Sequence, residues 1–216
     1  MNKTFDILLE SKINKYPELV RDKIYNYFAK NKASQAYLEL CTEKNWALNL
    51  DHLTVRTNNI DSAAKQYENL GWKYDEKLEY KSEGWWAKIY RHSEFAPFFI
   101  DQSYEEWPED KKIITNWVSK FSDKDFHHIA VLLPANIKME MAIDLLKAKN
   151  IKFLGQITGQ ADTRLRQVFS QAELIDGIPF TVLELVERNI DPITGKIYKG
   201  FIGEQADSLM KDSTLS

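Results

Sequence analysis

The sequence predicts an α+β fold in which two β-α-β-β-β modules build one curled mixed sheet, with helices before the modules and one helix after them. A strand pattern with a histidine near its start occurs twice, at residues 51–57 and 127–133. Each copy is followed by a helix pattern and further strand patterns in the same order. The last strand of each copy begins with Pro-Phe, at residues 97–98 and 179–180. An internal repeat of this kind predicts equivalent modules side by side, with a cleft in the concave face of their sheet.

The first 46 residues are predicted to be helical, because apolar side chains such as Leu8, Leu9, Ile13 and Tyr16 recur at helical spacing. We expect these helices to pack on the sheet. The predicted segments of the chain are an N-terminal helical segment at 1–46, a first module at 47–104, a linker at 105–125, a second module at 126–188, and a C-terminal turn with a capping helix at 189–216.

The first module begins with a strand, followed by a helix with Asn59 or Asp61 as its N-cap. Gly71 is expected to end this helix. Its strand patterns lie at 48–57, 72–80, 84–90 and 97–102.

The second module repeats this order, with a helix at 138–149 that ends at Asn150. Its strand patterns lie at 127–133, 153–155, 165–170 and 180–186. A turn at 192–195 then leads to a short helix at 201–210. This last helix either caps the core or closes the mouth of the cleft.

Composition excludes several classes of function. The net charge is −3 and the basic residues are spread along the chain, so we expect no nucleic-acid interface. No apolar stretch is long enough to span a membrane, and the first ten residues do not look like a signal peptide. The single cysteine, Cys41, excludes an intrachain disulfide and a thiolate zinc cluster, which fits a reducing, cytoplasmic setting. The sequence leaves the oligomeric state undecided.

Two histidines and one glutamate on separate strands are the candidate metal ligands. Side chains alternate along a strand, so Glu184 points away from its neighbours Leu183 and Leu185. A buried carboxylate is costly unless it is paired or bound to a metal. Glu187, at the strand end, is expected to be solvated, and we therefore prefer Glu184.

His127 and His128 compete as the second histidine, since neighbouring residues of a strand point to opposite faces. Matching residues 51–55 to 127–131 pairs His52 with His128. His52, His128 and Glu184 would form a three-ligand site with open positions, which suits iron(II) and dioxygen chemistry.

At these residues the chain resembles the vicinal oxygen chelate superfamily, whose paired β-α-β-β-β modules surround a divalent metal. Residues 127–130 are similar to the second-histidine strand of the 4-hydroxyphenylpyruvate dioxygenases, and residues 183–188 to their glutamate strand. Taken whole, the chain resembles more closely the DUF1338 group, which includes the 2-oxoadipate dioxygenase/decarboxylases. The segments that carry this likeness are 51–56, 165–167 and 200–210.

The resemblance implies metal ligation by His52, His128 and Glu184, with Fe(II) as the metal. The same ligands also take zinc, nickel, cobalt or manganese. The resemblance further implies a 2-oxo acid and dioxygen as the small-molecule partners, and oxidative decarboxylation as the reaction. The chain is expected to be much shorter than those decarboxylases and to lack segments that define their substrate pocket, which leaves the identity of the 2-oxo acid open.

Arg56 is the candidate catalytic and substrate-binding residue that the resemblance implies. It shares a strand face with His52, and a guanidinium suits the binding of a carboxylate. Pairing with Asp51 or Glu184 is the structural alternative. Arg166 and Gln167 are further candidate substrate contacts, on opposite faces of their strand.

Other functions of the same fold remain open at this point. A glyoxalase-like isomerase or lyase, an epimerase or a ring-cleaving dioxygenase would also use a divalent metal. Glyoxalase-like sites often have a fourth protein ligand, whereas the matching position of the first module lies near Phe99 or Ile100, neither of which binds metals. A metal-free binding protein is the remaining alternative.

Overall fold

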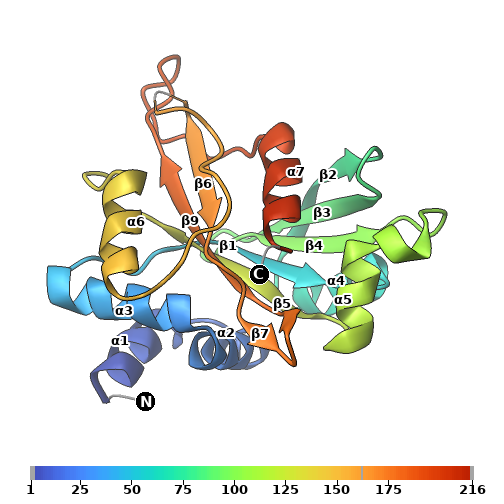
Figure 1. Cartoon of the computed structure of the whole chain (residues 1–216), viewed down its shortest axis with the longest axis horizontal. Helices are drawn as coiled ribbons and strands as arrows, with labels where there is room; N and C mark the ends of the chain where they lie inside the picture. Colours follow the sequence, from blue (N-terminus) through green and yellow to red (C-terminus); the bar gives the residue numbers. More distant parts are fainter. Residues whose placement is uncertain (1–2, 162, 215–216) are drawn as a thin grey trace. The chain divides into compact units, whose positions relative to one another are not determined.

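The computed structural model describes residues 3–161 and 163–214, and it confirms the α+β fold with a mixed sheet (Figure 1). Seven strands follow one another in the order β2-β3-β4-β1-β5-β9-β6. Their bounds are β1 Leu50–Arg56, β2 Lys73–Tyr80, β3 Trp85–Arg91, β4 Phe98–Ser103, β5 Asp125–Leu132, β6 Leu165–Phe169 and β9 Val182–Arg188.

The chain divides into two compact units, and the divisions fall inside β1 and β5. Unit 1 comprises Met1–Asp51 and Ala130–Ser216, and unit 2 comprises His52–Ile129. His52 and His128 therefore belong to unit 2, whereas Glu184 belongs to unit 1.

Unit 2 contains the predicted first module. Helix α4 (Ile60–Glu68) begins after Asn59, whose side chain accepts a hydrogen bond from the Ser62 backbone N–H at 2.8 Å. This confirms Asn59 as the N-cap. The chain leaves the helix through Gly71, whose φ of +103° is unfavourable for residues with a side chain. Strands β1 and β4 are parallel, while β4, β3 and β2 are antiparallel neighbours.

The two faces of the unit 2 sheet differ in character. On the face that α4 covers, β1 presents Leu53 and Val55, and Phe98 of β4 stacks on Tyr67 of α4 with ring centroids 4.0 Å apart. The other face begins with His52, Thr54 and Arg56 of β1. We call it the polar face of unit 2.

Unit 1 contains the predicted N-terminal helices, α1 (Lys3–Ile13), α2 (Glu18–Lys30) and α3 (Lys32–Lys44). Figure 1 shows these helices next to one another, with α6 (Met139–Ala148) beside α3. The Tyr27 hydroxyl donates to the Val182 carbonyl, and the Asn31 amide donates to the Thr181 hydroxyl at 3.2 Å. These bonds fix the start of β9 against the helices.

The predicted strand at 153–155 is wrong. This segment is irregular, and Leu154 is exposed, so it has no face to bury. In its place, Thr158 exchanges two backbone hydrogen bonds with Gln167 of β6, at 2.9 and 3.0 Å. β6 pairs on its other side with β9 in antiparallel register.

Four short elements were not predicted. Residues 105–125, expected as a linker, contain the 3-10 helix Glu109–Lys111 and helix α5 (Ile113–Lys120), which buries Ile114, Trp117 and Val118. The hairpin of β7 (Leu174–Ile175) and β8 (Ile178–Pro179) turns at Asp176 and Gly177, both with positive φ. Asp-Gly is a strong hairpin signal that the sequence analysis did not use.

The predicted C-terminal helix is α7 (Gly203–Asp212). Its Leu209 packs with Phe169, Ala172 and Val182 in a buried cluster of unit 1, which favours the core-capping role over the lid role. The predicted segments at 1–46 and 189–216 include residues 1–2 and 215–216, which lie outside the described residues. Among the described residues, none of the helices has the length and apolar character needed to cross a membrane.

Candidate functional site

The polar face of unit 2 brings two of the predicted ligands together. His52 of β1 and His128 of β5 are buried, and their rings meet edge to face with centroids 5.6 Å apart. Strand β4 is the other neighbour of β1, and the ring centroid of its Phe99 lies 4.9 Å from that of His52. Both imidazoles are therefore shielded from bulk water.

His127 contacts His128 and does not compete with it for the same position. The Nδ1 atoms of these two residues are 2.9 Å apart, within hydrogen-bond distance. When His128 donates from Nδ1, its Nε2 keeps the lone pair that a metal ion would require. His127 also packs edge to face on Trp117 at 5.8 Å.

Both histidines of this pair are neutral at pH 7. Burial lowers the pKa of His127 and of His128 well below the ordinary value, and the positive charge of Arg56 acts in the same direction. Neutral imidazole is the form that binds divalent metals. The electrostatics of unit 2 therefore fit the proposed ligand role.

Arg56 lies deep in the same unit, with 2 % of its surface exposed. Its guanidinium lies 5.6 Å from the Trp117 ring centre, and Asp101 of β4 is its partner in the parallel register. Burial lowers the pKa of Arg56 to about 9, while the charge of Asp101 raises it, so Arg56 stays cationic at pH 7. Asp51, considered as a partner for Arg56, instead binds Arg188 through both carboxylate oxygens at 2.6 and 2.9 Å.

Glu184 is the buried acid at the centre of β9 in unit 1, with 1 % of its surface exposed. Gln167 of the neighbouring strand β6 donates from Nε2 to Glu184 Oε1 at 2.6 Å. Gln167, which was predicted to contact the substrate, thus orients the carboxylate of Glu184.

Glu187 is buried, which corrects the expectation that it is solvated. Its carboxylate accepts hydrogen bonds from Lys138 Nζ and the Met139 backbone N–H, both at 2.9 Å, and from Arg166 at 2.9 Å. Arg166 also pairs with Glu140. These partners hold Arg166 and Glu187 on the strand face opposite to Gln167 and Glu184.

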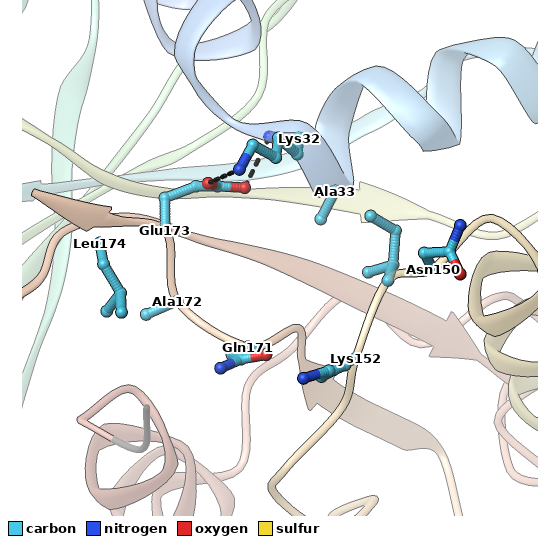
Figure 2. A pocket seen from close by; sticks show the side chains of 9 residues that line it. Lys32, Ala33, Asn150, Lys152, Gln171, Ala172, Glu173 and Leu174 are labelled. Atoms are coloured by element: carbon cyan, nitrogen blue, oxygen red, sulfur yellow. Dashed lines mark hydrogen bonds and ion pairs between the residues drawn. The ribbon is translucent and has the colours of Figure 1, made fainter. Parts of the chain in front are cut away.

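A separate pocket of about 310 Å³ lies in unit 1 (Figure 2). Glu173 at its edge accepts a hydrogen bond from the Lys32 backbone N–H at 2.8 Å, and its other oxygen lies 3.8 Å from Lys32 Nζ. The remaining lining comes mainly from Asn150, Lys152 and Gln171. Lys32 and Glu173 pair with each other, and the described residues that line the pocket include one carboxylate and no histidine or cysteine.

Sequence reasoning missed Asp101 and Trp117, the two residues that contact or face Arg56. Asp101 carries a signal, because it is an acid that directly follows the apolar residues Phe98, Phe99 and Ile100 of its strand. Trp117 lies in a segment read as linker, so nothing marked it.

With this geometry described, the chain can be compared with known proteins. No family profile matches the chain, and no curated protein matches its sequence. A structure of hydroxyglutarate synthase from Oryza sativa in complex with 2-oxoadipate has a TM-score of 0.73 at 16 % identity, and the match covers 99 % of this chain and 94 % of that chain. The expectation that this chain is much shorter is therefore wrong for this relative. A protein from Shewanella frigidimarina NCIMB 400 has a TM-score of 0.70 at 16 % identity, with 94 % and 99 % covered.

A mutant of 4-hydroxymandelate synthase from Streptomyces coelicolor is also similar, with a TM-score of 0.61 at 16 % identity. The match covers 77 % of this chain and 54 % of that chain. At such identities, likeness shows the fold alone. The repeated module, the strand order and these structural relatives together show that the chain has the vicinal oxygen chelate fold.

Proposed function

We propose that the chain is a non-haem Fe(II) dioxygenase and decarboxylase that converts a 2-oxo dicarboxylic acid, such as 2-oxoadipate, to a 2-hydroxy acid and CO2. The observation that carries the proposal is a group of three buried side chains, His52, His128 and Glu184, each of which offers one ligand atom to a metal ion. Two imidazoles and one carboxylate are the donor set typical of non-haem Fe(II) oxygenases.

The donors fit such a metal chemically. The imidazole of His128 is neutral and has its Nδ1 engaged by His127, which is how a metal-bound histidine is usually oriented. Glu184 is a carboxylate in an apolar strand, and a cation would offset the cost of burying it. Gln167 would hold the carboxylate in place.

The internal repeat supports a common site for these residues. In unit 2 the Thr57 N–H donates to the Asp101 carbonyl, and in unit 1 the Leu133 N–H donates to the Val186 carbonyl. Thr57 and Leu133 each follow their module's histidine by five residues, so Phe99 and Glu184 occupy equivalent positions. Because Phe99 contacts His52 in its module, we expect Glu184 to lie beside His128 in the other.

This equivalence also bears on the alternative function. Phe99 occupies the position where a glyoxalase-like isomerase would carry a fourth ligand, and phenylalanine cannot bind a metal. Three protein ligands favour a metal with several open positions for a 2-oxo acid and dioxygen. When bound, Fe(II) would supply the activation of dioxygen for oxidative decarboxylation.

The chain's own residues would bind and shield the substrate. Arg56 would bind the distal carboxylate of the acid, a role that its fixed charge and its contact with Trp117 support. The burial of His52 and His128 would exclude water. The 2-oxoadipate held by the solved Oryza sativa relative supports this class of substrate.

The test is turnover by metal-free protein reloaded with Fe(II) without oxygen and then mixed with dioxygen and a panel of 2-oxo acids. We expect one CO2 released for each dioxygen consumed with a dicarboxylic 2-oxo acid, and no turnover by the Zn(II)-loaded protein or by His52→Ala. No oxygen uptake across the panel would contradict the proposal. Turnover without oxygen would favour an isomerase or lyase of the same fold.

A further inference from the structure

Asp101 lies opposite Arg56 on the polar face of unit 2. The parallel register of β1 and β4 pairs the two residues directly. Asp101 is 3 % exposed and Arg56 is 2 % exposed, so both charged groups lie away from bulk water. Across the next strand pair, Asp101 is opposite Ala87, whose side chain is small and has no polar group.

Three polar atoms near this position are buried without a hydrogen-bond partner among the described residues. They are Asp101 Oδ1, Thr54 Oγ1 and Trp85 Nε1. Thr54 precedes Arg56 by two residues on β1, and Trp85 lies two residues before Ala87 on β3, so all three belong to the polar face. Buried polar atoms are paired in most native structures, so each exception calls for an explanation, and a bound ion or polar ligand is one that would serve all three atoms.

The two charges partly cancel. Burial raises the pKa of Asp101 to about 7, and the charges of Arg56 and His52 act in the opposite direction. Arg56 remains cationic, so the pair offers an incoming anion less than one full positive charge. A carboxylate of the substrate that binds Arg56 would also meet the negative charge of Asp101.

We propose that Asp101 is a specificity-determining residue that sets how strongly this site prefers a second carboxylate on its 2-oxo acid. This proposal rests on the proposed function. With Asp101 present, the site favours a distal group that accepts a hydrogen bond from Arg56 and donates one to Asp101. A hydroxyl or a protonated carboxyl can do both, whereas a simple anion cannot donate. Without the charge of Asp101, Arg56 would select a dianionic acid more strongly.

The test compares 2-oxoadipate with 2-oxohexanoate, which has the same chain length and no distal carboxylate. The measured quantity is the ratio of their kcat/KM values in the Fe(II)-loaded wild type and in Asp101→Asn, which keeps the shape and removes the charge. We expect this ratio to rise by at least about tenfold in D101N, as a buried charge at this range implies. A ratio that stays the same or falls would overturn the proposal, because Asp101 would then only position Arg56 or pack against it.

The matched control is Asp75→Asn. Asp75 forms an exposed ion pair with Arg91 at 2.5 Å in the same unit, so the chemical change is identical but is made at an ion pair that includes neither Asp101 nor Arg56. The ratio should stay unchanged in this variant. If D101N does not fold, as judged by circular dichroism, Asp101→Ser tests the same loss of charge.

A binding experiment separates this proposal from the proposed function. If the wild type turns over no 2-oxo acid, calorimetric titration of metal-free protein with glutarate and with pentanoate still measures the charge preference of the face. In Asp101→Asn, the ratio of the affinity for glutarate to the affinity for pentanoate should be about tenfold higher than in the wild type. An unchanged preference, or no binding of either acid by any of the proteins, would overturn the role given to Asp101.

Discussion

At the scale of single residues, the buried carboxylate of Glu184 depends on its partner Gln167. The 2.6 Å hydrogen bond from Gln167 Nε2 fixes one carboxylate oxygen inside an apolar strand. Groups that orient a metal ligand in this way commonly change metal affinity by about 10- to 100-fold when they are removed. The strength of metal binding should therefore depend on a residue that is not itself a ligand.

Gln167→Leu is expected to weaken metal binding by about tenfold or more, because Glu184 loses its fixed orientation. Competition titration against a metal-sensitive dye measures this effect. Gln35→Leu is the matched control, since Gln35 donates to the Phe28 and Ala29 carbonyls away from the proposed site. Equal affinities in wild type and Gln167→Leu would show that this hydrogen bond does not support a metal ligand.

The pair of Arg166 and Glu140 predicts a pH dependence of stability. The hydrogen bond from Arg166 lowers the pKa of Glu140 from its ordinary value of 4.5 to about 2. Because the folded-state pKa is depressed, the stabilisation is fully present above pH 4.5 and is lost as the pH falls toward 2. Glu140 is more than half exposed, so the contribution is about 1 kcal/mol or less.

Glu140→Gln should remove this contribution. The difference in free energy of unfolding between wild type and variant is expected to be constant above about pH 5 and to shrink toward pH 2. Urea unfolding at a series of pH values measures it. A difference that grows as the pH falls would contradict the assigned pair.

At the scale of elements, helix caps of two kinds can be compared. Asn31 caps α3 by accepting from Ser34, and its buried amide also donates to Thr181 before β9. Asn59 caps α4 by accepting from the Ser62 backbone N–H at an exposed position. The first asparagine joins elements that are far apart in sequence, whereas the second acts locally.

Asn31→Ala is therefore expected to cost more than Asn59→Ala. Loss of a cap costs about 1 kcal/mol, and each buried polar group left unpaired adds about 1–3 kcal/mol. The expected losses are about 1 kcal/mol for Asn59→Ala and about 2–4 kcal/mol for Asn31→Ala. Denaturant midpoints for both variants give the comparison, and equal losses would show that the bond to Thr181 contributes nothing.

The elements of the first module could be predicted because local signals agree there. The cap residue Asn59, the glycine at 71 and alternating strands all point to the same boundaries. The prediction of a strand at 153–155 was wrong because a short apolar run does not show whether it has a surface to pack against. Helix α5 was not predicted for a related reason, since the apolar side chains that it buries are recognisable only once the fold is known.

At the scale of the whole molecule, the internal repeat contributed more to the prediction of the fold and of the candidate ligands than any single motif did. Matching the modules selected His128 over His127, and strand parity selected Glu184 over Glu187. The reason given against Glu187 was wrong, because its partners Lys138 and Arg166 come from segments 49 and 21 residues away. Such long-range partners, like the pairing of Arg56 with Asp101, follow from the fold and not from local sequence.

The fold also explains how one chain would hold three ligands on three strands. Duplication gives each module a histidine at the start of its first strand, and divergence at one position leaves Phe99 in one module and Glu184 in the other. A metal bound in this way should stabilise the native state by about 4 kcal/mol when its concentration is a thousandfold above Kd.

The measurement that tests the central claim most directly is the metal content of protein purified without chelators and then loaded with Fe(II) in the absence of oxygen. We predict about one metal ion per chain in the wild type and in His92→Ala, whose histidine lies in a loop and bonds the Glu94 backbone. His52→Ala, His128→Ala and Glu184→Ala should each lose most of the metal. Equal metal content in the wild type and in these three variants would contradict the site.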